Sequence, residues 1–268
     1  MGIRFVKMHG LGNDYVFING FETKVGDPDR LARVMSERRT GVGSDGLILI
    51  LPSMSHDFRM RIFNADGSEA DTCGNGIRCF AKYVYEEGLT RRTEFVIETL
   101  AGPTRVWLTT EGDEVRRVRC DMGVPKLLRS QIPMLGQESE VIEEPLDVGG
   151  SEYRVTCVSM GNPHTVIFVD DADTVPVETI GPHIERHPRF PNRTNVEFVE
   201  VRDRKNVIMR VWERGSGETL ACGSGCCAAA VASARTGRTD KMVIVHLKLG
   251  ALTIAWDSDG HVYMEGPA

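Results

Sequence analysis

Met60-Arg61-Ile62-Phe63, which runs on to Cys73-Gly74-Asn75-Gly76, returns 149 positions later as Met209-Arg210-Val211-Trp212 and Cys222-Gly223-Ser224-Gly225. The same offset, without a gap, relates Glu69 to Glu218 and Gly12-Asn13 to Gly161-Asn162. The chain is therefore a duplication, and each half carries one cysteine directly before a glycine-rich turn. Two equivalent thiols suit a reaction that treats a substrate alike from two sides, such as the inversion of a stereocentre.

The length and composition fit two modest globular domains. The chain has 268 residues, of which 41% are hydrophobic and 26% are charged. Since a typical domain has about 150 residues, this length favours two domains, in agreement with the duplication. The net charge of −6 leaves no basic stripe for a phosphate backbone, so we exclude nucleic-acid partners.

The chain shows no targeting or membrane signal. Residues 1–15 are charged and interrupted by glycine, and no run of about 18 apolar residues occurs. We expect a cytoplasmic protein that does not interact with a membrane.

Seven cysteines are an odd number in a chain without an export signal, which argues against a disulfide framework. Most reduced cysteines are small buried hydrophobic residues. We expect that role for Cys79, Cys120, Cys157, Cys226 and Cys227. Only Cys73 and Cys222 have a sequence context that indicates chemistry.

Short β-rich runs recur along the chain, several with the alternation of a half-buried strand. They are residues 47–51, 58–63, 95–99, 115–120, 165–169, 207–212, 242–247, 252–256 and 262–264. The sequence therefore predicts an α/β protein of the α+β type, with more strand than helix. We expect the N-terminal half to span residues 1–122, joined by the last strand at 262–268, and the C-terminal half to span 123–261.

A helix is predicted after each of the two cysteines. Asn75 can cap the first helix and Gly88 can end it, whereas Ser224 and Gly237 do the same for the second. The second helix is apolar almost all round, and such a helix is normally enclosed. We therefore expect each half to be a mixed sheet or barrel wrapped around a central helix.

Both cysteines then lie at helix N-termini, where chemistry is favoured. A free cysteine titrates near pH 8.5, and a helix N-terminus can lower that value to about 3.5–7.5. The glycine-rich turn exposes backbone N–H groups that can hold a carboxylate. One thiolate can thus remove an α-proton while the opposite thiol delivers another, a scheme that requires no cofactor.

Two other interpretations of these motifs fail on context. Gly41-Val42-Gly43-Ser44-Asp45-Gly46 has the Gly-x-Gly-x-x-Gly pattern but runs into a strand, whereas the dinucleotide fingerprint requires a helix there. The cysteine spacings Cys-x5-Cys and Cys-x3-Cys-Cys do not match structural zinc sites. We predict no metal and no cofactor.

His164 and Glu213 are candidates for tuning the pKa values of the thiols. His164 lies just past Asn162, and Glu213 occupies the repeat position of Asn64 at the end of a strand. Many lone histidines and most exposed glutamates are structural or solvated, but these two fall within dense motifs.

Six ordered motifs identify the family that the chain resembles, and it is the diaminopimelate epimerase family, along essentially the whole chain. The motifs are residues 10–14 (GLGND), 63–68 (FNADGS), 73–76 (CGNG), 159–164 (SMGNPH), 192–196 (NRTNV) and 213–219 (ERGSGET), the last leading to 222–225 (CGSG). The resemblance implies a cofactor-independent epimerase that interconverts L,L- and meso-2,6-diaminopimelate in lysine and peptidoglycan precursor biosynthesis. It also implies two similar domains with the active site in the cleft between them.

The resemblance implies a role for each motif residue. Cys73 and Cys222 would be the acid–base pair, and His164 and Glu213 would modulate their pKa values. Substrate-binding residues would be Asn13, Asn64, Gly74, Asn75, Asn162, Asn195, Glu213, Arg214, Gly223 and Ser224. The far end of diaminopimelate is zwitterionic, and a guanidinium with amide or carboxylate acceptors matches it.

Some features depart from the family or leave alternatives open. Gly46 stands where many members carry glutamine, and Thr165 replaces a frequent cysteine. A proline racemase-like amino-acid racemase and a non-catalytic cysteine-bearing or metal-binding protein are the alternatives. The partner that we expect is a small amino-acid substrate, and the sequence leaves open whether the chain forms a homodimer.

Overall fold

A computed structural model describes residues 2–268 and divides the chain into two compact units. The first unit is Met1–Asp121 together with Glu265–Ala268, and the second is Met122–Met264. Within residues 2–268, no helix is long and apolar enough to cross a membrane. Each unit is described separately below.

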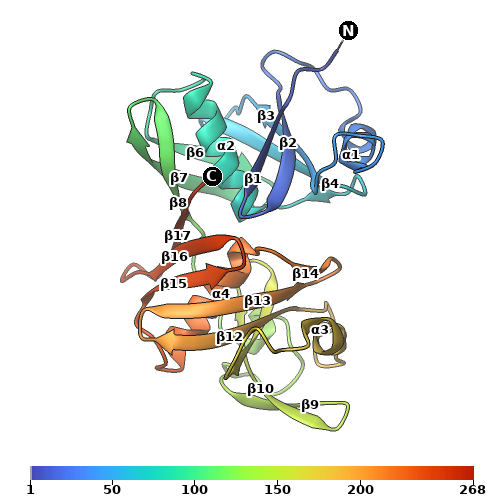
Figure 1. Cartoon of the computed structure of the whole chain (residues 1–268). Helices are drawn as coiled ribbons and strands as arrows, with labels where there is room; N and C mark the ends of the chain where they lie inside the picture. The colour runs from blue at the N-terminus through green and yellow to red at the C-terminus, as the bar shows by residue number, and fades with distance from the viewer. Residues whose placement is uncertain (1) are drawn as a thin grey trace. The chain divides into compact units, whose positions relative to one another are not determined.

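The first unit is a mixed sheet of eight strands with two helices (Figure 1). The strands are β1 (Val6–Gly10), β2 (Asn13–Asn19), β3 (Gly46–Leu51), β4 (Phe58–Asn64), β5 (Glu69–Ala70), β6 (Glu94–Thr99), β7 (Gly102–Glu111) and β8 (Glu114–Asp121). Hydrogen bonding gives the order β1-β2-β3-β4-β6-β7-β8, and the short β5 pairs with β4. The β2/β3 and β4/β6 pairs are parallel, whereas the others are antiparallel.

The second unit repeats this topology. Its strands are β9 (Glu144–Val148), β10 (Ser151–Ser159), β11 (Pro163–Val169), β12 (Asn195–Asp203), β13 (Asn206–Glu213), β14 (Gly217–Thr219), β15 (Met242–Leu247), β16 (Gly250–Trp256) and β17 (Val262–Gly266). Hydrogen bonding gives the order β9-β10-β11-β12-β13-β15-β16, and the short β14 pairs with β13. The β11/β12 and β13/β15 pairs are parallel. The last residues of β17 fold with the first unit.

The shared strand order confirms the predicted α+β class with more strand than helix. All nine β-rich runs predicted from the sequence lie in strands. The repeat also explains the matched glutamates, because each pairs across its hairpin with an arginine. Arg61 lies 2.6 Å from Glu69, and Arg210 lies 2.8 Å from Glu218.

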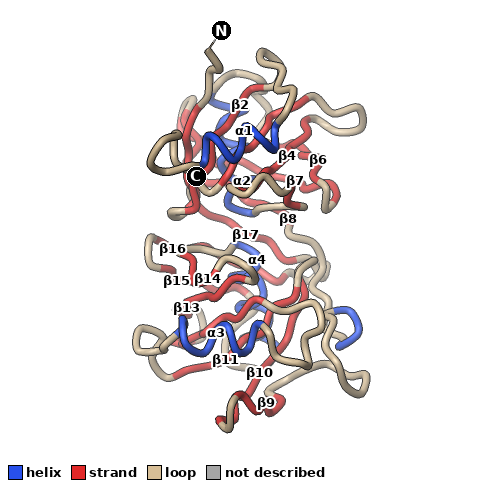
Figure 2. Tube along the Cα trace, turned by 90° about the vertical axis from the view of Figure 1, so that its right-hand side faces the viewer, coloured by secondary structure: helices blue, strands red, loops and turns tan. Residues whose placement is uncertain are grey.

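One helix is central to each unit: α2 (Gly74–Glu86) in the first and α4 (Gly223–Arg235) in the second. Helix α2 contacts strands at both ends of its sheet, β1 and β2 as well as β7 and β8, so the sheet curls around it. Helix α4 contacts β10, β11, β12, β13, β15 and β16 in the same way. Figure 2 shows each helix among the strands of its own unit, as the apolar pattern of the second helix predicted.

The residue that caps each central helix differs from the prediction. The N-cap is Cys73 in α2 and Cys222 in α4, rather than Asn75 or Ser224. Each cysteine has extended backbone angles, and its sulfur accepts the N–H group three residues later, as a serine or aspartate cap would. The helices therefore begin one residue after each cysteine.

Two further helices, α1 (Pro28–Ser36) and α3 (Val177–Glu185), were not predicted from the sequence. Helix α1 carries a recognisable start signal, because the Asp27 side chain accepts the N–H of Arg30 and Pro28 lies in the first turn. Helix α3 has no side-chain cap and contains Pro182, so its sequence is a weaker signal.

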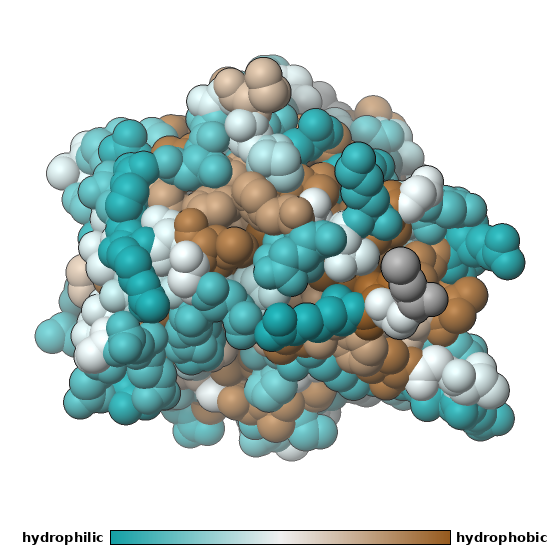
Figure 3. Space-filling model, turned by 90° about the horizontal axis from the view of Figure 1, so that it is seen from above, coloured by the Kyte–Doolittle hydropathy of each residue, from teal (hydrophilic) through white to brown (hydrophobic). Residues whose placement is uncertain are grey.

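The apolar residues of the strands form the core of each unit. Val16, Ile18 and Leu47 are fully buried in the first unit, and Val196 and Ile184 are fully buried in the second. On the face seen in Figure 3, hydrophobic residues form separate patches between hydrophilic ones. Scattered exposed apolar residues are usual on a protein surface and indicate no site by themselves.

Candidate active site

The first half-site surrounds Cys73, where α2 begins. The Gly76 N–H donates to the Cys73 sulfur at 3.4 Å, and the Cys73 thiol donates to Asn13 Oδ1, also at 3.4 Å. Asn75 Nδ2 donates to the same Asn13 oxygen at 3.3 Å. Cys73 is half-buried, whereas Asn75 is buried. Strand β2 and helix α2 thus bring together four residues that the sequence assigned to the site, because Gly74 is the first residue of the helix.

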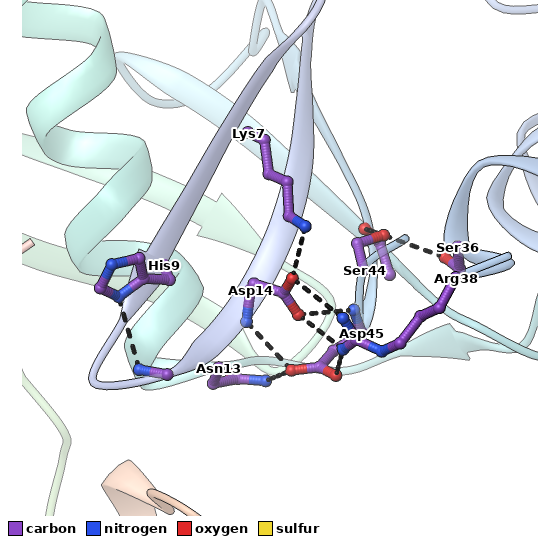
Figure 4. Close-up of polar contacts among 10 residues, drawn as sticks. Lys7, His9, Asn13, Asp14, Ser36, Arg38, Ser44 and Asp45 are labelled. Atoms are coloured by element: carbon purple, nitrogen blue, oxygen red, sulfur yellow. Dashed lines mark hydrogen bonds and ion pairs between the residues drawn. The ribbon is translucent and has the colours of Figure 1, made fainter. Parts of the chain in front are cut away.

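A cluster of charged side chains holds the side chain of Asn13 in place (Figure 4). Asn13 Nδ2 donates to Asp45 Oδ2 at 2.8 Å. The other Asp45 oxygen accepts from Arg38 at 2.8 Å, and Asp14 accepts from Arg38 and Lys7. Because a carboxylate only accepts hydrogen bonds, Asp45 turns the amide NH₂ of Asn13 towards itself and the amide oxygen towards Cys73.

Tyr15 is a residue near Cys73 that sequence reasoning missed. It follows Asn13 by two residues on β2 and is buried, and Cys73 and Asn13 both influence the pKa of its hydroxyl. Burial first, and then Cys73, raise the pKa of Tyr15 well above its usual value, so the phenol is protonated. Gly46 leaves room for the ring, since a Cβ there would lie 3.0 Å from Tyr15 Cε1 and 2.2 Å from the Phe63 carbonyl oxygen.

Asn64, at the end of β4, is half-buried and has its own local hydrogen bonds. Its Nδ2 donates to Ser68 Oγ at 3.0 Å, and its backbone N–H donates to the Ser68 carbonyl. These bonds hold the tight turn after β4. The described contacts of Asn64 therefore do not include Cys73.

The second half-site surrounds Cys222, where α4 begins. The Gly225 N–H donates to the Cys222 sulfur at 3.4 Å, and Ser224 Oγ lies 3.6 Å from it. Burial raises the pKa of Cys222 well above its usual value, and the nearby carboxylates of Glu213 and Glu197 raise it further. The Ser224 hydroxyl and the Gly225 N–H lower it by less. The lowered pKa expected at this helix start is therefore wrong for Cys222, because burial and negative charge outweigh the helix N-terminus.

Glu213, which was predicted from the sequence to tune the thiols, is the last residue of β13. The Thr219 hydroxyl donates to Glu213 Oε1, and the Glu213 carboxylate is close enough to Cys222 to raise the pKa of that thiol. The residue as a whole is half-buried, but its carboxyl group is deep enough that burial raises its pKa. Interactions of the ionised carboxylate with the Thr219 hydroxyl and with Cys222 oppose that rise.

Asn195 and Arg214 lie together beyond Glu213. Asn195 is buried on β12, where its Nδ2 donates to the Pro163 carbonyl at 2.8 Å and its Oδ1 accepts the Arg214 N–H at 2.9 Å. The Arg214 guanidinium is exposed and donates to the Asn192 carbonyl at 3.0 Å. An exposed guanidinium next to Glu213 can bind a carboxylate group of a ligand.

His164 is buried and lies between two polar side chains of the second unit. Its Nδ1 is 2.7 Å from Glu197 Oε1, and its Nε2 is 3.0 Å from Asn162 Oδ1. Asn162 Nδ2 in turn donates to Ser224 Oγ at 3.4 Å. His164 and Glu197 are fully buried, and burial raises the pKa of Glu197. Glu197 was not singled out from the sequence.

The remaining cysteines are buried away from this chemistry. Burial raises the pKa values of Cys79, Cys120 and Cys157 to about 12, so these thiols are protonated and inert at neutral pH. Cys226 and Cys227 are fully buried in α4. In the part of the chain that the structure describes, no three His, Cys, Asp or Glu side chains are grouped to hold a metal ion.

The family model for diaminopimelate epimerase matches residues 5–128 and 156–268 of this chain. The chain belongs to the diaminopimelate epimerase family. A diaminopimelate epimerase from Moorella thermoacetica is 59% identical over 268 residues, covering 99% of this chain and 96% of that protein. A diaminopimelate epimerase from Pelotomaculum thermopropionicum is 56% identical with the same coverage.

Solved structures with a similar fold extend beyond the diaminopimelate epimerase family. A probable proline racemase from Agrobacterium radiobacter K84 has a TM-score of 0.72 and 16% identity, covering 99% of this chain and 90% of that chain. A hydroxyproline epimerase from Agrobacterium vitis has a TM-score of 0.70 and 16% identity, with 99% and 89% covered. At such low identity these likenesses concern the fold alone.

Proposed function

We propose that this member of the diaminopimelate epimerase family interconverts L,L- and meso-2,6-diaminopimelate, with Cys73 and Cys222 as a two-base pair and without a cofactor. The observation that carries the proposal is the repeated cysteine cap. In both halves a cysteine sulfur accepts a backbone N–H at a helix start, 3.4 Å away, in a chain that is 59% identical to a diaminopimelate epimerase.

The proposed reaction moves one proton in and one proton out. One cysteine thiolate removes the α-proton of the substrate and becomes a thiol, while the thiol of the other cysteine donates its proton to the opposite face of the α-carbon and becomes a thiolate. The backbone N–H groups at Gly74-Asn75 and Gly223-Ser224 bind the α-carboxylate, which takes up the negative charge that develops. The configuration is inverted and the total number of protons is unchanged.

Cys222 enters this cycle as the thiol, because its burial and the two nearby carboxylates favour the protonated form. In that direction of the reaction Cys73 enters as the thiolate, and the two roles are exchanged in the reverse direction. When Cys73 gives up its proton, Asn13 Oδ1 loses one of its two hydrogen-bond donors. That oxygen can then accept a hydrogen bond from the ammonium group of the substrate.

The other predicted residues would recognise the substrate. Arg214 would bind the distal carboxylate, and amide and carboxylate oxygens would accept from the distal ammonium group. We assign this binding role to Asn64, Asn162, Asn195, Glu213 and Arg214. We also propose that the two compact units are the two epimerase halves, and that the enzyme is cytoplasmic and assembles as a homodimer.

Solvent exchange tests this function directly. Incubation of the enzyme with L,L-diaminopimelate in deuterated water is expected to place deuterium at the α-carbon and to produce the meso isomer, both measured by NMR. Proline is the comparison substrate, because it lacks the second charged end that Arg214 and Glu213 would bind. Exchange into proline without exchange into diaminopimelate would show a proline racemase-like enzyme instead.

A further inference from the structure

Glu197 is a buried carboxylate for which the two-thiol scheme has no role. It lies on β12 with its side chain fully buried, and its Oε1 is 2.7 Å from His164 Nδ1. Its Oε2 has no hydrogen-bond partner among residues 2–268. A buried charged group normally has all of its hydrogen bonds satisfied, so the position of Glu197 requires an explanation.

The hydrogen bonds of His164 fix where its protons lie. Asn162 Oδ1 can only accept, so His164 Nε2, at 3.0 Å, carries a hydrogen that it donates to that oxygen. Since Nδ1 faces a carboxyl oxygen, a second proton is held between Nδ1 and Glu197 Oε1. Glu197 therefore fixes the orientation of the imidazole ring, and the ring fixes the orientation of the Asn162 side-chain amide.

The orientation of Asn162 matters for the half-site around Cys222. With Oδ1 bound to His164, Asn162 turns its Nδ2 towards Ser224 Oγ at 3.4 Å. Ser224 Oγ is in turn 3.6 Å from the Cys222 sulfur. A continuous row of contacts thus connects Glu197 to the catalytic thiol.

Helix α4 also rests directly on Glu197. A Cβ at Gly225 would lie 2.9 Å from Glu197 Oε1 and 3.3 Å from the Cys222 sulfur. The glycine of the Cys222-Gly223-Ser224-Gly225 turn therefore makes room for this carboxylate. The charge of Glu197 also affects the pKa values of three ionisable groups, which are Glu213 on β13, Cys222 at the start of α4 and Cys157 on β10.

The duplication shows that the fold does not need a carboxylate at this place. The residue 149 positions before Glu197 is Ile48, which is buried on β3, and its Cδ1 lies 2.7 Å from where a Cβ of Gly76 would be. The corresponding strand, helix start and glycine thus form equally well over an apolar side chain. A buried ion pair is rarely more stable than well-packed apolar residues, so stability does not account for Glu197.

We propose that Glu197 is a positioning residue for epimerisation, which holds the His164 ring so that Asn162 presents its N–H₂ group towards Ser224 beside Cys222. The inference rests on the proposed function of Cys222 and His164. It assigns Glu197 a role in orienting these groups, and none in contacting the substrate.

Three variants test the proposal by steady-state kinetics in both directions. Glu197→Ile, which copies Ile48, should lower kcat at least about tenfold, because it leaves His164 Nδ1 without a partner. Glu197→Gln keeps an amide oxygen for the Nδ1 hydrogen and should retain at least a third of the wild-type kcat. Glu200→Gln is the matched control, since Glu200 is a buried, ion-paired residue on the same strand, and its kcat should stay within twofold of the wild type.

Nitrogen-15 NMR of the His164 ring gives a readout that is independent of activity. In the wild type, Nε2 should carry a slowly exchanging hydrogen at neutral pH, and Glu197→Ile should make that hydrogen exchange faster. Any of three results would overturn the proposal. The wild-type ring could carry no hydrogen on Nε2, or Glu197→Ile could show the kcat and the ring signals of the wild type. The third such result is that Glu197→Gln is as inactive as Glu197→Ile. If instead the ring signals behave as expected and the wild type inverts no diaminopimelate, the positioning role stands and the proposed function fails.

Discussion

The surroundings of Cys73 and of Cys222 share a backbone and differ in charge. Both sulfurs accept an N–H at 3.4 Å from the glycine three residues later. The Cys73 thiol also donates to Asn13, whereas Asn162, at the matched position of the repeat, donates to Ser224 Oγ. The side chains that complete the two half-sites differ. Tyr15, Ile48 and Asn64 in the first unit correspond to His164, Glu197 and Glu213 in the second, each pair 149 positions apart.

This difference teaches how a duplicated site becomes asymmetric. The backbone features, namely the helix starts and their N–H groups, are retained, and the proposed mechanism requires them in both halves to bind the substrate carboxylate. Around Cys222, burial and two carboxylates raise the pKa of the thiol. Around Cys73, a protonated phenol and neutral amides surround the sulfur. The proposed two-base reaction needs one thiol and one thiolate, and this asymmetry favours Cys222 as the thiol.

Removal of either thiol should produce the largest effect. Cys73→Ala and Cys222→Ala are each expected to lower kcat/KM for inversion about 10³-fold, the scale of general acid–base catalysis. The measurement is formation of the meso isomer from L,L-diaminopimelate, followed by NMR in deuterated water. Cys227→Ala, a fully buried cysteine of α4, serves as the control and should invert the substrate. Full inversion by either of the first two variants would refute the two-base scheme.

Removal of the charge of Glu213 and introduction of a charge at Asn64, its matched position in the repeat, should change the reactivity of the nearby thiols in opposite directions. The Glu213 carboxylate raises the pKa of Cys222, so Glu213→Gln should lower that pKa and allow alkylation of Cys222 to begin at a lower pH. We expect a roughly threefold to tenfold faster reaction with iodoacetamide at pH 8, as for the loss of one nearby charge. Alkylation is measured for each cysteine by mass spectrometry of peptides.

The reverse variant, Asn64→Asp, is the counterpart of this experiment. It places a carboxylate in the first half-site and should slow the alkylation of Cys73 without affecting Cys222. An unchanged pH profile for Cys222 in Glu213→Gln would mean that burial alone sets its pKa, and that the comparison of charges does not explain the asymmetry.

The smallest expected effect concerns Tyr15, the counterpart of His164. Tyr15→Phe removes a hydroxyl whose pKa is influenced by Cys73 and Asn13, and a polar interaction of this kind is worth about 1 kcal/mol. We therefore expect kcat to fall roughly two- to tenfold in both directions of the reaction. Tyr153→Phe, at a partly buried tyrosine that packs against the core of the second unit, is the matched control. A kcat equal to that of the wild type would leave Tyr15 with a packing role only.

The strands and central helices could be predicted because their signals are local. Residues 58–63 alternate between apolar and charged side chains, and β4 is buried at the alternate positions Phe58, Met60 and Ile62. The start of α2 was placed near Cys73 from the glycines that follow it, but the cap was assigned to Asn75. Sequence reasoning failed there because cysteine is an unusual capping residue, and the sulfur accepts the Gly76 N–H only in the folded turn.

The partners of each thiol could not be predicted, because they come from other strands. Asn13 meets Asp45 across 32 positions, and His164 meets Glu197 across 33. Both contacts depend on the register of a parallel strand pair, β2 with β3 and β11 with β12. A shift of one residue would turn each of these side chains to the other face of its sheet, and nothing in the local sequence fixes that register.

The sequence by itself determined the duplication, the α+β class and the two cysteines at helix starts, because all three follow from repeated motifs and from local periodicity. Only the tertiary structure decided the electrostatic character of each half-site. The pKa of a thiol depends on burial and on charges within a few ångströms, and those neighbours are brought together by strand register. The same cysteine-glycine turn is thus polar and half-buried at Cys73 but buried beside two carboxylates at Cys222.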